Sequence, residues 1–203
     1  KMVALDPETG SARADRAIGA FDRVASQWSD AVVKACRDTR IDRTQSEGLL
    51  TKRMDCLDQA LTKLSTSIGA VEGAADARDL NARLRVLDGL PFVEMCSEVA
   101  QLAGYPALPD DPNKLREYRS LSTELQELNV EYLIGNLAEH ARRTPAAVDR
   151  GRKLGDPRLL ARLIDQLALA KQAAGSYDEM VTLTKEAIAL ASEAHDDRIV
   201  ADM

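Results

Sequence analysis

Aromatic side chains and cysteines are scarce in this sequence, and long apolar runs are absent. Its 203 residues include one tryptophan, four tyrosines, two phenylalanines and three cysteines. β-Sandwich strands favour aromatic and β-branched side chains, so the composition argues against that fold. A membrane-spanning helix needs about 18 consecutive apolar residues, and the sequence has neither such a run nor a secretory signal. We therefore expect no membrane insertion by this fragment.

Positive charge is also in the minority. The chain carries 27 lysines and arginines against 33 aspartates and glutamates, a net charge of −6. Nucleic-acid-binding proteins usually carry a basic surface, so this balance predicts no nucleic-acid partner. The cysteines and the two histidines lack the spacing of metal ligands. With no ordered catalytic set either, the sequence predicts no catalytic residues, no metal and no cofactor, and therefore no enzyme.

Two stretches of heptad-spaced apolar residues dominate the first third of the chain. The first comprises Ala14, Ile18, Phe21, Ala25, Trp28, Val32 and Ala35, and the second Leu50, Met54, Leu57, Leu61, Leu64, Ile68 and Val71. This spacing is typical of a coiled-coil seam. It predicts an antiparallel hairpin of helices over residues 11–38 and 46–71, with Ser46 as the N-cap of the second helix and Trp28 opposite Leu57.

Shorter helices and a boundary follow the hairpin. We expect a helix over residues 75–88 and another from Pro91, a residue suited to the first helical position, to Gly104. The proline-rich stretch 105–112 cannot continue a helix. It predicts a boundary between a hairpin domain, residues 1–104, and a second domain, residues 113–203.

The second domain contains an internal repeat. Gly135-Asn136-Leu137 recurs about forty residues later as Gly175-Ser176-Tyr177, which predicts two helix pairs that stack as a solenoid. The expected helices cover residues 113–134, 137–153, 157–174 and 177–194. Within the second of these, we expect Pro145 to kink or split the helix, with Thr144 capping the second piece. The chain ends where a third pair would begin, so we expect a piece of a longer polypeptide.

Residues of the second pair resemble a tetratricopeptide repeat, namely Leu167-Ala168, Gly175, Tyr177 and Ala187. The resemblance implies an all-α, α-solenoid fold in which the first helix of each pair lines a partner-binding groove. The implied groove residues are Arg116, Arg119, Arg162, Asp165, Leu169 and Gln172. Their mixed character suits a protein or peptide partner.

The N-terminal part resembles a helical segment of bacterial receptor-like serine/threonine protein kinases. The resemblance rests on Trp28, Ala35-Cys36, Thr39, Gln45-Ser46, Leu49-Leu50, Arg53, Cys56-Leu57, Cys96 and the stretch 109–112. In those proteins a cytoplasmic kinase precedes a membrane helix, this segment and tetratricopeptide repeats. Kinase motifs are absent from the sequence. The resemblance therefore implies a non-catalytic, extracytoplasmic sensing or interaction region that can self-associate as a homo-oligomer.

Two other classes of function compete with this interpretation. The first alternative is a stand-alone cytoplasmic tetratricopeptide scaffold or chaperone-like adaptor. The second is a helical domain that binds a small molecule or catalyses a reaction, which would need a pocket with convergent polar groups. No residues in the sequence demand such a pocket.

The state of the three cysteines stays open at the level of sequence. The hairpin register separates Cys36 from Cys56 by more than a disulfide spans. The extracytoplasmic location implied by the resemblance would favour a bridge. Cys56 and Cys96 are one candidate pair, another pairing is a second alternative, and three buried thiols are the third.

Overall fold

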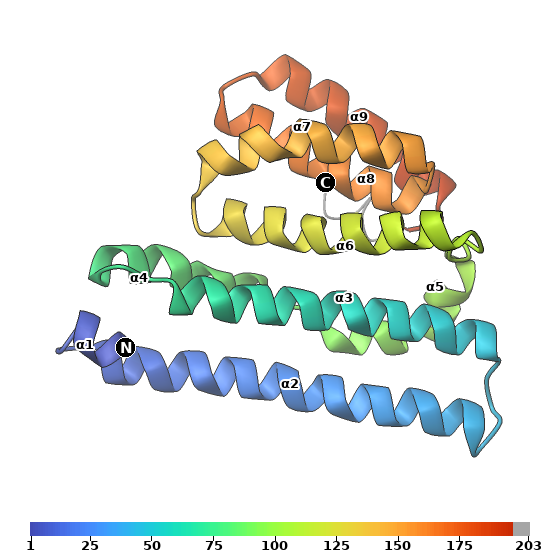
Figure 1. Ribbon diagram of the computed structural model, residues 1–203, viewed down its shortest axis with the longest axis horizontal. Coiled ribbons are helices and arrows are strands. Elements are labelled where there is room, and N and C mark those ends of the chain that lie inside the picture. Colours follow the sequence, from blue (N-terminus) through green and yellow to red (C-terminus); the bar gives the residue numbers. More distant parts are fainter. Residues whose placement is uncertain (197–203) are drawn as a thin grey trace. The chain divides into compact units, whose positions relative to one another are not determined.

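Residues 1–196 are described by the computed structural model, and within this range the chain is helical with no β-strand (Figure 1). The predicted all-α class is therefore confirmed for these residues. Two compact units are present: Lys1–Glu98 with Tyr132–Gly135, and Val99–Glu131 with the chain from Asn136 onward. The end of the predicted second domain, and the predicted start of a third helix pair, lie partly outside the described residues.

The first unit is built on a hairpin of two long helices, α2 (Gly10–Arg40) and α3 (Glu47–Glu72), which follow the short α1 (Met2–Leu5) (Figure 1). The predicted N-cap is confirmed, because the Ser46 hydroxyl accepts a hydrogen bond from the Leu49 amide at 3.2 Å. The predicted register is confirmed as well. The indole Nε1 of Trp28 donates to the backbone oxygen of Leu57 at 2.9 Å.

The buried seam of the hairpin is shifted by one residue from the predicted one at several levels. Ile18 and Leu61 were expected in the seam but are 55% and 40% exposed. Ala17 and Ala60, one residue earlier, are buried instead. A segment beyond the hairpin also packs on both helices. Heptad spacing within two helices carries no information about this third element.

That third element is a strap of two short 3₁₀ helices, η1 (Leu84–Gly89) and η2 (Val93–Ser97), which follows α4 (Ala77–Arg83). We call residues 84–97 the strap. The predicted α-helix over 75–88 is therefore α-helical only over Ala77–Arg83, and the predicted helix from Pro91 to Gly104 is α-helical only over Val99–Gly104. The Cys96 carbonyl accepts a hydrogen bond from a buried arginine side chain, and regular α-helix resumes only at Val99.

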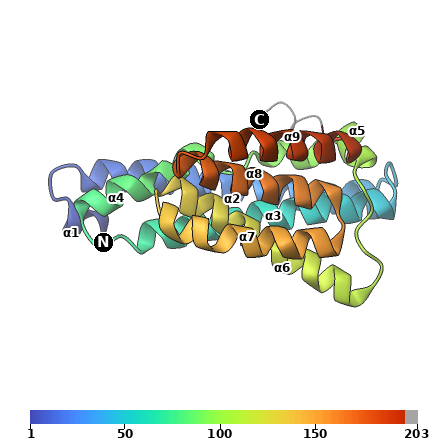
Figure 2. The same ribbon diagram turned by 90° about the horizontal axis from the view of Figure 1, so that it is seen from above.

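The second unit contains α5 (Val99–Gly104), most of α6 (Pro112–Leu133), α7 (Leu137–Leu154), α8 (Pro157–Ala173) and α9 (Tyr177–Glu193). Figures 1 and 2 show α8 running alongside both α7 and α9. Their common core is made of Tyr118, Leu121, Leu125, Leu128, Ala147, Val148, Leu159, Leu160, Leu163, Ile164 and Ala187. The core thus joins side chains from four consecutive helices.

The turns between these helices recur at even spacing. Gly135, Gly155 and Gly175 have φ of 79°, 77° and 77°, and His195 takes the next such position with φ 54°. This left-handed backbone is the usual way to end a helix, and it suits glycine because glycine has no Cβ. After three of these residues, the next amide bonds a carbonyl five residues earlier: Asn136 to Glu131, Ser176 to Lys171, and Asp196 to Ala191.

Of the two predicted outcomes at Pro145, a kink or a split, the split does not occur. α7 runs unbroken through this residue, and the proline ring is exposed. Thr144 does not cap a second piece either, since its hydroxyl donates to the His140 carbonyl within the same helix. The missing amide of Pro145 thus falls inside a helix held by packing on its buried side.

Truncation of the central seam residue should destabilise the first unit. We expect Trp28→Ala to lower the free energy of unfolding by about 3–5 kcal/mol, because it removes a large packed side chain and a hydrogen bond. Urea denaturation followed by far-UV circular dichroism measures this. Ile18→Ala is the matched control on the same helix and should change stability by less than about 0.5 kcal/mol. Equal losses in the two variants would contradict the observed seam.

Two glycine substitutions should have opposite effects. Gly175→Ala places a side chain at positive φ and should cost about 1 kcal/mol. Gly19→Ala, in the interior of α2 with open space around the new Cβ, should stabilise by up to about 1 kcal/mol. Thermal unfolding of both variants beside the parent protein tests the pair. Stabilisation by Gly175→Ala would exclude the left-handed turn.

Candidate functional site

A buried arginine lies at the turn end of the hairpin. Arg53 is only 1% exposed although it sits on α3 among apolar seam residues. Its Nη1 donates to Asp38 Oδ2 at 3.0 Å and to Gln45 Oε1 at 2.9 Å. One partner lies near the end of α2 and the other precedes α3, so the guanidinium fixes both sides of the turn.

The same guanidinium also binds the strap. Arg53 Nε donates to the backbone oxygen of Cys96 at 3.3 Å, and Nη2 lies 3.5 Å from the Ser97 hydroxyl. An unpaired buried charge is costly, so these acceptors and Asp38 are what allow Arg53 to remain inside. Arg53 therefore joins three segments that are distant in the sequence.

Further polar contacts hold these partners in place. The Gln45 side-chain amide donates to the Ala35 carbonyl at 2.8 Å and to the Thr39 hydroxyl at 2.6 Å. Hydrogen bonds from Lys34, and then from Arg53, lower the pKa of Asp38. The carboxylate therefore stays charged opposite the arginine at neutral pH.

Cys56 and Cys96 form a disulfide beside Arg53, with their Cα atoms 5.5 Å apart. This pairing is one of the alternatives that the sequence left open. Cys36 is exposed and outside any disulfide. The bridge ties η2 of the strap to α3 and closes a loop of 40 residues.

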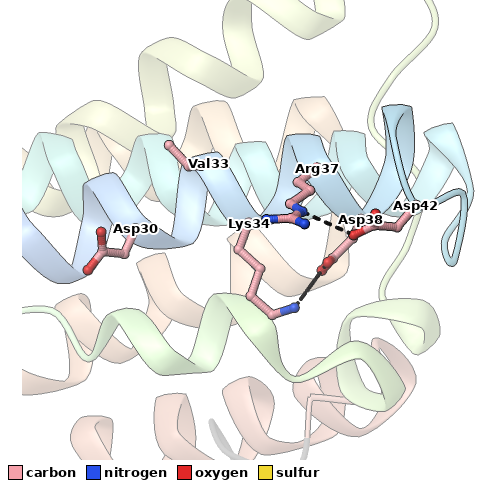
Figure 3. Close-up of a pocket in the computed structure, with 6 residues that line it drawn as sticks. All are labelled: Asp30, Val33, Lys34, Arg37, Asp38 and Asp42. Carbon is pink, nitrogen blue, oxygen red and sulfur yellow. Dashed lines mark hydrogen bonds and ion pairs between the residues drawn. The ribbon is translucent and has the colours of Figure 1, made fainter.

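An open hollow of about 440 Å³ lies along the last turns of α2 (Figure 3). It is lined by Asp30, Val33, Lys34, Arg37, Asp38 and Asp42. Four of its five charged side chains pair with one another, Lys34 with Asp38 and Arg37 with Asp42. Such an open surface lacks the enclosed apolar walls of a small-molecule site.

The predicted groove residues of α8 do lie on one stripe. Arg162, Asp165 and Leu169 are half-buried and Gln172 is exposed, whereas the residues between them on α8 are largely buried. Arg116 and Arg119 are exposed on α6, and the Arg116 guanidinium donates to Asn113 on the same helix. α8 therefore presents one mixed polar and apolar stripe outside the core.

An arginine ladder, which the sequence analysis missed, joins α6 to α7. Arg143 binds Glu127 and Glu131 at 2.6 Å each, and Arg150 binds Glu117 and Glu124. Burial by itself lowers the pKa of Arg143, but the hydrogen bonds that its guanidinium donates to Glu127 and Glu131 raise it overall. Both of these arginines of α7 are thus paired with glutamates of α6, and these ion pairs hold the two helices together.

His140 and Gln166 form a buried polar contact between α7 and α8. His140 is fully buried, and its Nε2 lies 3.2 Å from Gln166 Oε1. Burial lowers the pKa of His140, although the hydrogen bond to the Gln166 side-chain oxygen partly opposes this. The imidazole is therefore neutral at pH 7. The sequence offered no signal for this contact, because its partners are 26 residues apart.

Neither a metal centre nor a membrane helix is found in the described part of the chain. Residues 1–196 bring no three histidine, cysteine or acidic side chains together as metal ligands would be. None of the helices in this range is both long and apolar enough to cross a bilayer. The geometry described above offers contact surfaces and structural clamps.

Comparison with known proteins gives no match. No protein family fits the chain, and neither a curated protein nor a solved structure shows significant similarity to it. Functional inference therefore depends on the geometry of the chain itself.

Removal of the disulfide should destabilise the first unit. A bridge that closes a loop of 40 residues contributes roughly 4 kcal/mol by restricting the unfolded chain. We expect the Cys56→Ser/Cys96→Ser double variant to lose about that much in urea denaturation. Cys36→Ser, which touches no bridge, is the control and should unfold like the parent protein. A double variant as stable as the control would contradict the bridge.

Acid should weaken the second unit through His140. Its pKa in the folded protein lies below the value of about 6.5 typical of an unfolded chain, so the unfolded state takes up more protons as the pH falls. Stability should therefore be full above about pH 6.5 and decline below it. Melting temperatures between pH 7.5 and 5, for the parent and for His140→Gln, measure this. The variant should show a flatter pH dependence; parallel curves would exclude His140 as the cause.

Proposed function

We propose that this chain is a non-catalytic protein-interaction region that binds a protein or peptide on the outer stripe of α8. The observation that carries the proposal is the difference in burial between the residues of α8. Eight of its 17 residues are buried, whereas Arg162, Asp165, Leu169 and Gln172 are half-buried or exposed and share one stripe. Both charge signs and one apolar side chain on a rigid helix suit recognition of an extended chain or a helix.

The evenly spaced turns support a repeat architecture for this region. Left-handed residues at Gly135, Gly155, Gly175 and His195 give each helix and its turn about twenty residues, or forty for a pair. The small residues Ala147 and Ala187, at equivalent positions of successive pairs, are both fully buried. We propose that the helix pairs form a tetratricopeptide-like solenoid, with α6 and α8 as the groove helices and with Arg116 and Arg119 extending the same surface.

We further propose that the region belongs to a bacterial receptor-like serine/threonine kinase, as its sensing or scaffolding part. The disulfide between Cys56 and Cys96 supports an extracytoplasmic location, because such bridges persist in oxidising compartments. The alternative is a stand-alone scaffold or chaperone-like adaptor. A kinase domain and a membrane helix encoded upstream in the same reading frame would favour the first proposal, and their absence the second.

A peptide-display experiment tests the proposed surface. The full chain is immobilised, a library of random extended peptides is selected against it, and the enriched peptides are titrated by fluorescence anisotropy. We expect Arg162→Glu and Gln172→Ala to weaken binding at least about tenfold, the loss of one or two good polar contacts. Lys153→Glu, an exposed charge change on α7, is the matched control and should bind normally.

Folding of each variant is checked by its melting temperature before titration. Peptides that bind the parent and all three variants equally would exclude the α8 stripe. Failure to enrich any peptide over an unrelated helical protein would contradict the proposed function itself.

A further inference from the structure

We propose that the strap is a redox-responsive element: the Cys56–Cys96 disulfide keeps η2 closed on the hairpin, and reduction by a dithiol lets it open locally. The inference concerns the first unit and does not depend on the proposed α8 surface. It rests on what holds the strap in place and on the unequal exposure of the two sulfur-bearing residues.

The secondary structure of the strap consists only of short 3₁₀ helices, which do little to hold it in place. η2 contains five residues of 3₁₀ helix, a form with poorer hydrogen-bond geometry than an α-helix. At its ends, the Met95 amide bonds the Phe92 carbonyl and the Glu98 amide bonds the Met95 carbonyl, both at 3.2 Å. Short elements of this kind open more readily than long helices. The position of η2 is therefore set by its contacts with the hairpin.

η2 is held on the hairpin by one covalent bond, the disulfide, and by a small number of apolar contacts and hydrogen bonds. Val93 is 1% exposed and packs with Val24, Leu57 and Leu64 of the hairpin. Arg53 binds the Cys96 carbonyl, and the Gln27 side chain donates to Glu94 at 2.7 Å. The noncovalent contacts make closure favourable after reduction, but without the bridge η2 can separate from α3. Reduction should therefore raise the frequency of local opening while the hairpin stays folded.

The two cysteines differ in their exposure to solvent, and this difference decides which of the two sulfur atoms the reductant attacks. Cys96 is 2% exposed, whereas Cys56 is half-buried. A thiolate of the dithiol attacks Cys56 Sγ, the Cys56–Cys96 bond breaks, and Cys96 leaves as a thiolate.

The second step completes the exchange. The other thiol of the reductant loses its proton and attacks its own sulfur in the mixed disulfide, so that Cys56 leaves as a thiolate. The reductant departs as a disulfide, oxidised by two electrons. The two protons that it lost end on Cys56 and Cys96, which become thiols.

Hydrogen–deuterium exchange with mass spectrometry tests the proposal on the full chain, air-oxidised or reduced with dithiothreitol. We expect amides of residues 90–98 to exchange at least about tenfold faster after reduction. Amides in the centre of α8, which lies in the other unit, should be unchanged, and those in the centre of α2 should stay slower than those of residues 90–98. Cys36→Ser should respond as the parent does, while Cys56→Ser/Cys96→Ser should exchange rapidly with and without dithiothreitol.

Three results would overturn the proposal. The first is unchanged amide exchange at residues 90–98 in the reduced parent protein. This measurement uses no variant, so it does not depend on whether a variant folds. The second is exchange in the centres of α2 and α3 that is as fast as at residues 90–98 after reduction, which would make the bridge a staple of the whole unit. The third is peptide mapping that finds Cys56 and Cys96 both as free thiols in the air-oxidised protein.

Discussion

A full positive charge buried among apolar side chains constrains the first unit. Arg53 has almost no access to water, so its charge must be balanced by groups that the fold brings to it. Asp38 comes from the end of α2, Gln45 from the turn, and the Cys96 carbonyl from the strap. Each of these segments must be in place for the others to be stable, and the neighbouring disulfide fixes the same junction covalently.

Heptad spacing was sufficient to predict the hairpin but not its exact face. The predicted helices over 11–38 and 46–71 end within two residues of α2 and α3, because apolar periodicity and a serine N-cap are local signals. Ile18 and Leu61 were misplaced because spacing within two helices does not show which of their flanks later segments cover, and η2 packs on both helices. The η2 segment itself was mistaken for α-helix, since its conformation depends on contacts with Arg53 and Cys56 that no local pattern encodes.

The candidate site residues divide in the same way. The resemblance to tetratricopeptide repeats implied the stripe from Arg162 to Gln172, whose members, three or four residues apart, share one side of α8. Arg53 was overlooked as a buried residue because a single arginine in a heptad ordinarily lies at the surface. His140 and Gln166 gave no signal because each is unremarkable in its own helix. Buried polar contacts between distant residues are thus what the sequence concealed, and they determine how these helices are held together.

A double-mutant cycle on Arg53 and Asp38 tests the central claim most directly. Arg53→Met, Asp38→Asn and the double variant are compared with the parent protein by urea denaturation at pH 7. If the buried cation organises the first unit through its carboxylate partner, the two losses will be non-additive by about 1–3 kcal/mol. Strictly additive losses would contradict the account, because they would mean that the hairpin, the turn and the strap do not depend on this ion pair.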